Sequence, residues 1–477
     1  MRNVPVTRAQ AILYTLIVYQ VVLIAIGLWA SRRTRNTSEF FLADRGLGAW
    51  VASLSASASS SSAWTLLGVS GAAYVWGLSA LWLFPATLLG FVINWTWVAP
   101  RLRQISASEA SLTLTEVIAG DSQDPLYRII VRVAAVMILF SFVFYIAAQF
   151  QAAGGAFAAT FGLSTNTSVL IGAAVILLYT LLGGFWAVSV TDALQGLLMV
   201  CVAVFLPWMA LAAVGGVGVL AAGLEASGSA AEMSLTGEFE GVMGLAFVLG
   251  TLGIGLGYPG QPHVVNRFMA LKDGQALARG RFIAIGWAVA VYAGMLLLGL
   301  SARVLFPVAD AEQVLFVVAN ELLSPVIAGV VVAAVLSATM STADSQLLVA
   351  ASAGSYDWKL PYRGHGSLIL PRAVVVVVSI LACLITLYAP EAIFSRVLFA
   401  WHALGSAFGP LLILKLCGVR VGSSAILLSM GLGFGLTVLF HLLPDTPGDF
   451  LERVVPLLAA FSVAWLGRCK ATITRFS

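Results

Sequence analysis

Runs of apolar residues, separated by short polar stretches, recur from the first residues of the chain to the last. A helix that crosses a bilayer needs about 20 mostly apolar residues, and thirteen segments fit that pattern. They lie near residues 9–31, 49–75, 78–99, 129–160, 166–185, 188–214, 241–260, 282–306, 325–350, 371–389, 394–415, 423–443 and 454–467. The pattern predicts an all-α polytopic membrane protein with about 13 transmembrane helices and no room for a separate soluble domain.

Composition and charge point the same way. Of the 477 residues, 60% are hydrophobic and 10% charged, and the mean hydropathy is +0.99, which excludes an ordinary soluble domain. The formal net charge is +4, but the basic residues are scattered among the loops. We therefore expect a lipid bilayer as the partner and no nucleic acid.

The positions of Lys and Arg predict the orientation. The gaps that follow odd-numbered segments must all lie on one side of the membrane. Together with the adjoining helix ends and the tail after residue 467, these gaps hold 20 of the 25 Lys and Arg. The others are Arg2, Arg8, Arg303, Arg396 and Arg453. By the positive-inside rule, the amino terminus is predicted outside and the carboxyl tail in the cytoplasm.

Two segments are poor continuous helices. Residues 53–64 read SLSASASSSSAW, with seven serines in ten positions, and residues 250–262 read GTLGIGLGYPGQP, with five glycines and two prolines. Serine competes for backbone hydrogen bonds, and glycine and proline weaken the helical ladder. Irregular backbone at membrane depth is tolerated only where protein or a watery cavity satisfies it, so both segments are expected to line one cavity.

The two irregular segments lie five spans apart. Transporters built from two inverted repeats of five helices interrupt the first helix of each repeat at the substrate site. If the span at 9–31 is an extra leading helix, the irregular spans are the first and sixth of such a core. The alternative is that small residues simply allow close helix packing.

Ionisable residues inside the predicted spans are few. Asp192 and Asp344 lie near the ends of their spans, and intramembrane charges by default suggest function. Hydroxyls beside Asp344 could complete an oxygen site for a hard cation such as Na⁺, or hydrogen-bond neighbouring helices. His402 is the histidine that looks buried, either neutral and satisfied by a neighbour or proton-linked. His263 and His365 are placed in cytoplasmic loops, and with no nucleophile–base pair or metal-ligand cluster an enzyme is not expected.

Five blocks of the sequence resemble, in order and spacing, the sodium/proline branch of the sodium:solute symporter family. They are FFLADRGLG (40–48), GGFWAVSVTDALQ (183–195), GYPGQPHVVNRFMA (257–270), MSTADSQLLV (340–349) and SAFGP (406–410). The resemblance covers nearly the whole chain. It implies a bacterial inner-membrane protein that couples Na⁺ influx to uptake of a small solute by alternating access.

The fold implied by the resemblance is a LeuT-type core of five plus five inverted helices with additional peripheral helices. The whole chain, 1–477, is then one transporter domain. It is expected to comprise an extra leading helix at 9–31, repeat one at about 49–214, repeat two at about 241–415 and peripheral helices at about 423–467.

The same resemblance implies site residues, with Na⁺ as coupling ion and no other cofactor. The principal Na⁺ site falls on Ala58, Ser61, Ala338, Ser341 and Thr342. A second Na⁺ site, present in some members, falls on Asp192, Ser341, Asp344 and Ser345. The substrate pocket falls on Ser62, Trp64, Tyr145, Tyr258 and Pro262.

The implied substrate is a small organic solute, with proline as first candidate and another amino acid or a small carboxylate next. Two positions depart from the sodium/proline pattern: Ser60 replaces an aspartate, and Ile254 replaces a tryptophan near the second irregular segment. Two alternatives stay open. One is an H⁺-coupled symporter of the same fold, favoured by Ser60 and His402, and the other is a transporter-like sensing module.

Overall fold

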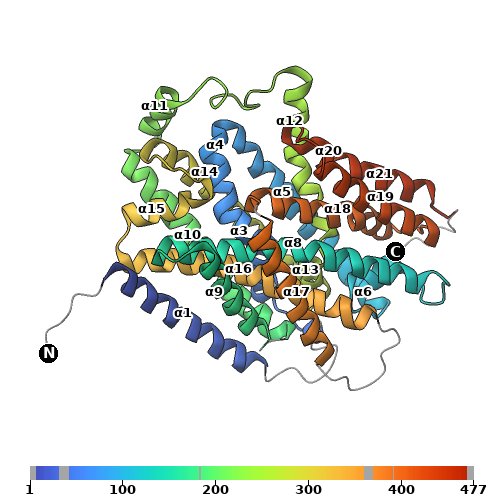
Figure 1. Cartoon of the computed structure of the whole chain (residues 1–477). Helices are drawn as coiled ribbons and strands as arrows, with labels where there is room; N and C mark the ends of the chain where they lie inside the picture. Colours follow the sequence, from blue (N-terminus) through green and yellow to red (C-terminus); the bar gives the residue numbers. More distant parts are fainter. Residues whose placement is uncertain (1–6, 32–41, 182–183, 359–368, 390, 470–477) are drawn as a thin grey trace.

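The computed structural model describes residues 7–31, 42–181, 184–358, 369–389 and 391–469. His365 and the carboxyl tail after Cys469 lie outside these residues. The described part is helical, and Figure 1 shows the helices packed side by side around a central group.

Each of the thirteen predicted segments coincides with helical structure. The longer helices are α1 (Arg8–Ser31), α3 (Ala49–Ala63), α5 (Leu83–Ile93), α8 (Tyr127–Phe161), α9 (Thr165–Thr180), α10 (Phe185–Val214), α11 (Val217–Ser227), α12 (Gly241–Leu256), α14 (Gly274–Leu305), α16 (Pro325–Ser352), α17 (Ile369–Tyr388), α18 (Ile393–Leu416), α19 (Ser423–His441) and α21 (Val455–Leu466). Shorter ones include α4 (Val69–Trp76), α6 (Ala99–Ser108), α7 (Leu114–Ala119), α13 (Pro262–Met269), α15 (Val314–Leu322) and α20 (Phe450–Arg453).

Ten helical stretches in the described residues are long and apolar enough to cross a membrane. One of them, 49–108, contains two of the predicted spans, and its backbone departs from helical geometry at Ser62 and again at Gly77, between α4 and α5. The last predicted span is a helix of only 12 residues, Val455–Leu466. A multi-pass membrane protein is therefore supported by the helices themselves, since their composition would be unfavourable in water.

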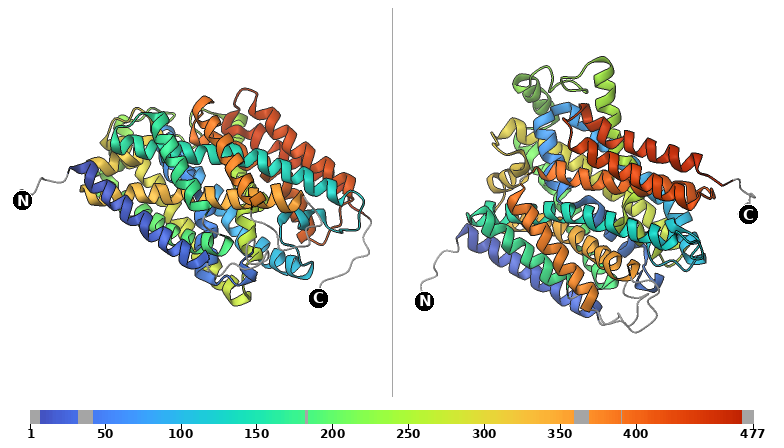
Figure 2. Two further views of the ribbon diagram at one scale, coloured as in Figure 1. Left: turned by 60° about the horizontal axis from the view of Figure 1, so that its bottom comes forward. Right: turned by 45° about the vertical axis from the view of Figure 1, so that its right-hand side comes forward.

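Burial separates a central group of helices from a peripheral one. In α18 94% of the most apolar window is buried, and in the stretch 325–357, which contains α16, 83% is. The corresponding shares are 22% for α1, 22% for α17 and 28% for α19, which lie at the edge of the bundle (Figure 2). The first helix, α1, packs on α16 and α10.

The first irregular segment contains a single sharp break. The serine-rich stretch is helical up to Ser61, and the chain departs from helical geometry at Ser62 (φ 44°, ψ −174°). The second is broken over a longer stretch, because α12 ends at Leu256, a 3₁₀ turn covers Tyr258–Gly260 and α13 starts at Pro262. Both interruptions were predicted, although the serine run itself is more helical than its composition indicates.

The chain segment that enters α3 is joined to the segment that leaves α13. Leu47 N–H donates to Ala270 O at 3.0 Å, and Lys272 N–H donates to Leu47 O at 3.0 Å. Arg45, one of three consecutive residues with positive φ, donates to Met269 O at 2.8 Å and to Ser111 O at 2.8 Å. The entry to α3 and the exit from α13 are thus hydrogen-bonded to each other.

Candidate functional site

The break at Ser62 leaves backbone donors that side chains satisfy. Trp64 N–H donates to Ser62 Oγ at 3.2 Å, so that Ser62 caps the helix that continues toward α4. Ala63 N–H donates to Gln149 Oε1 at 3.1 Å, reaching across to α8. A positive φ at a non-glycine residue is strained and is typical of functional sites. The break therefore presents the amino end of a half-helix, which carries a partial positive charge, inside the protein.

The second break is held by α18 and by Asn94, the residue that directly follows α5. Gln261 Nε2 donates to Trp401 O at 2.7 Å and to Gly257 O at 3.1 Å. The indole of Trp401 returns a hydrogen bond to Ile254 O at 3.1 Å, and Asn94 Nδ2 donates to Tyr258 O at 3.2 Å. Carbonyls released by the loss of helix thus find partners on neighbouring helices, which unwound backbone at membrane depth requires.

The structure places all five predicted substrate residues in the buried interior near the two breaks. They are Ser62, Trp64, Tyr145, Tyr258 and Pro262. Tyr145 OH donates to Ser62 Oγ at 3.5 Å, which joins α8 to the first break. Pro262 is the first residue of α13 after the second break.

Tyr292, on α14, links residues of the two breaks and was not predicted from the sequence. Its hydroxyl lies 3.3 Å from Tyr258 OH, 3.2 Å from Thr65 Oγ1 and 3.5 Å from Ser61 Oγ. Its ring lies 6.2 Å from that of Trp64. Tyr292 occurs in an ordinary apolar span with no local irregularity, so only three-dimensional packing reveals it.

Helix packing around Tyr258 leaves no space for added atoms. A Cβ on Gly90 would lie 2.1 Å from Tyr258 Cδ2, and one on Gly255 would lie 2.2 Å from Ala86 O. The ring of Trp401 meets that of Tyr258 edge-on at 4.6 Å. Glycine is thus required where α5 passes the second break.

The predicted principal Na⁺ residues come from α3 and α16, which are in direct contact. Thr342 Oγ1 donates to Ser59 O at 3.1 Å and lies 3.5 Å from Ala58 O. Ser59 Oγ donates to Ser341 O at 3.1 Å, and Ser341 Oγ donates to Ala338 O at 3.3 Å. The structure therefore brings Ala58, Ser341 and Thr342 together with Ala338 one turn away, whereas the Ser61 hydroxyl faces Tyr292.

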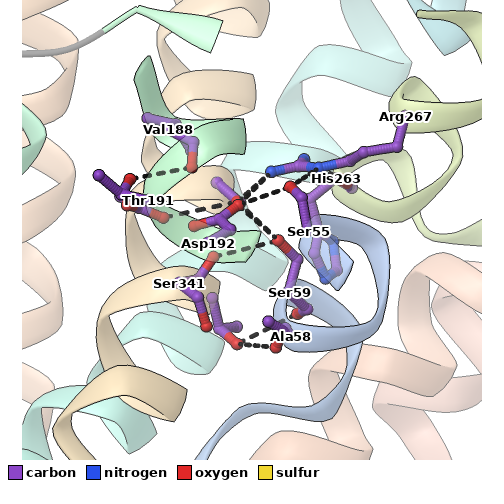
Figure 3. A network of polar contacts seen from close by, with 12 residues as sticks. Ser55, Ala58, Ser59, Val188, Thr191, Asp192, His263, Arg267 and Ser341 are labelled. Atoms are coloured by element: carbon purple, nitrogen blue, oxygen red, sulfur yellow. Dashed lines mark hydrogen bonds and ion pairs between the residues drawn. The ribbon is translucent and has the colours of Figure 1, made fainter. Parts of the chain in front are cut away.

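Further along the same interface lies a fully buried polar network, shown in Figure 3. Its centre is Asp192 of α10, whose Oδ2 accepts from Ser55 at 2.8 Å and from Ser59 at 3.3 Å. Ser345 Oγ lies 3.3 Å from the same oxygen and 3.5 Å from Asp344 Oδ1. The predicted second-site residues Asp192, Asp344 and Ser345 are thus joined through one hydroxyl.

Arg267 of α13 completes the network. Its Nη2 lies 2.9 Å from Asp192 Oδ2, and neither side chain is exposed. Arg267 also donates to Ser55 Oγ at 3.1 Å, to His263 O and to Ser345 Oγ. Its guanidinium lies over the ring of Phe185, 5.1 Å from the centroid. Sequence reasoning counted Arg267 as a loop residue, and that prediction is wrong because α13 turns it inward.

The placement of His263 in a cytoplasmic loop is also wrong. His263 is the second residue of α13 and is fully buried, with its ring 5.9 Å from that of Tyr145. His402 is buried as predicted, but neither of its ring nitrogens has a hydrogen-bond partner among the described residues, so the expected satisfying neighbour is not found. A proline directly before His263 marked the start of a helix, which was the available signal.

An acidic residue lies near the first break, in the segment between α14 and α16. Glu312, in the 3₁₀ turn Ala311–Gln313, accepts a hydrogen bond from Phe394 N–H at 3.1 Å. Burial raises the pKa of the Glu312 carboxyl from 4.5 to about 7. The ring of Phe394 packs against Trp64 at 5.6 Å, so this contact adjoins the pocket.

Comparison with known proteins identifies the family of the chain. The model of the sodium:solute symporter family matches residues 40–433. The sodium/proline symporter of Escherichia coli (strain K12) is 35% identical over 447 residues, covering 90% of this chain and 87% of that protein. The osmoregulated proline transporter OpuE of Bacillus subtilis (strain 168) is 34% identical, covering 88% and 87%.

A solved structure supports the fold. A Na⁺-coupled sialic acid symporter, described as a substrate-bound outward-open state with a novel Na⁺ site, has a TM-score of 0.78 at 16% identity, covering 97% of this chain and 99% of that one. The likeness supports a LeuT-type transporter fold, which the sequence resemblance implied. By its sequence and its fold, the chain belongs to the sodium:solute symporter family, membrane transporters that use Na⁺ to drive the movement of small solutes.

Proposed function

We propose that this protein is a Na⁺-coupled symporter of a small zwitterionic amino acid, with proline as first candidate. The observation that carries the proposal is the capped amino end of the half-helix at Ser62, beside buried aromatic side chains. Such an amino end can receive a carboxylate. An aromatic wall with a few hydroxyls suits the small apolar body of the same solute.

The relatives named as proline transporters support the choice of substrate, and the second break offers a physical reason as well. The tryptophan of that branch is replaced by Ile254, but Trp401 reaches the same backbone from α18 and packs on Tyr258. An indole is therefore still present at this break. We propose Ser62, Trp64, Tyr145, Tyr258 and Pro262 as the substrate-contacting residues.

For the ions we propose two sites on the α3–α16 interface. The first uses Ala58, Ser61, Ala338, Ser341 and Thr342, whose carbonyl and hydroxyl oxygens are the ligands that hard cations prefer. The second is the buried network of Asp192, Ser341, Asp344 and Ser345. Carboxylate charge at this site helps offset the loss of the ion's hydration, and Asp344 would substitute for the aspartate that Ser60 replaces.

The arrangement along the chain belongs to the same proposal. The leading helix at 9–31 is followed by repeat one at about 49–214, repeat two at about 241–415 and peripheral helices at about 423–467. The amino terminus is outside and the carboxyl tail inside. Labelling of single cysteines at the two chain ends by an impermeant thiol reagent, in intact cells and after permeabilisation, tests this orientation.

Uptake of radiolabelled proline into proteoliposomes, with an inward Na⁺ gradient or with choline, tests the function. Thr342→Ala is expected to lower the apparent Na⁺ affinity by about tenfold, since it removes a hydroxyl from the proposed site. Thr339→Ala is the matched control, because Thr339 is also buried on α16 but bonds to Leu336 O within its own helix. Uptake that ignores the Na⁺ gradient and follows a proton gradient would replace this proposal by the H⁺-coupled alternative.

A further inference from the structure

The deep network contains three buried charged groups whose charges do not cancel. Asp192, Asp344 and Arg267 are all fully buried, and with both carboxyl groups ionised two carboxylates and one guanidinium sum to one excess negative charge. An uncompensated buried charge is strongly unfavourable. The network is therefore short of one monovalent cation.

The two carboxylates are not equivalent. Asp192 Oδ2 faces Arg267 Nη2 at 2.9 Å and also accepts from Ser55. Asp344 forms no ion pair with an arginine in the described part of the chain. Ser345 Oγ lies 3.5 Å from its Oδ1, and its Oδ2 has no side-chain or backbone hydrogen-bond partner there. The negative charge that lacks a counter-charge thus belongs to Asp344.

Arg267 is fixed in place by more than Asp192. Hydrogen bonds to Ser55 Oγ, Ser345 Oγ and His263 O use its Nε, Nη2 and Nη1, and the face of Phe185 covers the guanidinium. A side chain held at every donor atom and shielded from solvent does not exchange with dissolved cations. It acts as a permanent positive charge.

We propose that Arg267 is the resident counter-cation of Asp192, so that Asp344 alone offsets the charge of one transported cation at the deep site. Asp192 is then a positioning residue that acts through Arg267, not a ligand that supplies the charge. The proposal rests on the proposed function, since it assigns roles within the second ion site. It also limits that site to one monovalent ion, with hydroxyls of Ser341 and Ser345 as further oxygen ligands.

Substitutions that remove the charges singly and in pairs test the assignment. Asp192→Asn leaves Arg267 unpaired beside Asp344, so the apparent Na⁺ affinity should fall about tenfold or more. Asp192→Asn combined with Arg267→Gln removes the pair and should restore the affinity to within about threefold of wild type. Asp344→Asn should weaken Na⁺ binding similarly, but adding Arg267→Gln should not restore it, although the net charge is again minus one.

The readout is the Na⁺ concentration that half-maximally stabilises the purified protein against thermal unfolding, in NaCl and choline chloride mixtures of constant ionic strength. Asp449→Asn with Arg453→Gln controls for loss of a buried arginine pair, because Arg453 is 2% exposed and pairs with Asp449 in the peripheral hairpin. This control is expected to bind Na⁺ as wild type does.

Two outcomes overturn the inference while leaving Na⁺ coupling intact. If Asp192→Asn with Arg267→Gln binds Na⁺ as weakly as Asp192→Asn, then Asp192 is itself the charged ligand. If both double variants recover the same Na⁺ affinity, then only the net charge of the network determines Na⁺ binding, and Asp344 has no special role. If the single variants do not fold, the Na⁺ affinities of the two double variants still test the inference, since only the variant that keeps Asp344 should bind Na⁺ nearly as wild type does. A wild type that Na⁺ does not stabilise, or whose uptake ignores Na⁺, overturns the proposed function first.

Discussion

Glu312 provides a pH-dependent contact whose size can be worked out. Its carboxylate accepts the N–H of Phe394 in the first turn of α18, where the capping residue Ala392 makes no side-chain hydrogen bond. Burial, and to a lesser extent the charge of Asp310, raise the pKa of Glu312, whereas the Phe394 N–H and Arg396 lower it, and the net pKa is about 7 compared with an ordinary value of 4.5. We expect Glu312→Gln to remove this titration and leave an amide oxygen for the Phe394 N–H.

The sign follows from the raised pKa. Folded protein binds the Glu312 proton more tightly than unfolded chain does, so this group's stabilisation is full below pH about 4.5 and is lost as pH rises through about 7. A pKa unit is worth about 1.4 kcal/mol, so the shift corresponds to at most about 3 kcal/mol of the free energy of unfolding. Contact with solvent reduces this, and we expect about 1–2 kcal/mol between pH 5 and pH 8.

Thermal unfolding of purified protein between pH 5 and pH 8, at constant Na⁺, measures the effect. Glu312→Gln should be more stable than wild type at pH 8, and the difference should shrink toward pH 5. Exposed Glu240, changed to Gln, is the matched control and should follow wild type. If the stability of wild type and of Glu312→Gln changes with pH in parallel, the reasoning is refuted, because the difference in stability between the two proteins reports the titration of this one carboxyl group.

Three further predictions concern the pocket and its closure. Tyr145→Phe removes the hydroxyl that hydrogen-bonds Ser62 and should weaken proline binding by about 0.5–1.5 kcal/mol in a binding titration, with little change in Na⁺ affinity. An equal loss of proline affinity and Na⁺ affinity would contradict a role in the substrate pocket. Gly90→Ala places a Cβ 2.1 Å from Tyr258 and should lower the affinity for proline. The control Gly286→Ala, whose Cβ would meet nothing within 4 Å, should leave this affinity unchanged. Equal affinities in the two variants would show that the Tyr258 ring can move aside without loss of binding. Arg45→Gln loses charge-assisted hydrogen bonds to backbone carbonyls, including that of Met269, and should lower the free energy of unfolding by about 1.5–3 kcal/mol. An unchanged melting temperature would mean that Arg45 does not make these hydrogen bonds in solution.

Much of the fold could be predicted because apolar length and backbone-breaking residues act locally. Gly and Pro at 257–262 cannot sustain a helix anywhere, so the second break was visible in the sequence. The first was harder to locate, because seven serines tolerate a helix whose neighbours bury them, and the break is confined to Ser62. The family implied which residues meet, and the packing of α3 on α16 agrees for Ala58 and Thr342.

The misses have one cause. Arg267 and His263 were assigned to a loop because they follow a proline-rich break, and polar residues after a span normally face water. In the structure the chain re-enters as α13, and a buried carboxylate on α10, 75 positions away in sequence, stabilises the arginine. No local pattern encodes a partner at that distance, so Arg267 could be placed only by the tertiary structure.

The hydrogen bonds between Leu47 and the segment 270–272 have a consequence for how the pocket is exposed to either side. The two hydrogen bonds form a short parallel bridge between Leu47 and Leu271, so sliding α3 past α13 would break both at once. The half-helices α3 and α13 are therefore expected to tilt together as one rigid unit. Because Arg267 travels on that unit while Asp192 stays on α10, tilting would pull directly on the buried ion pair.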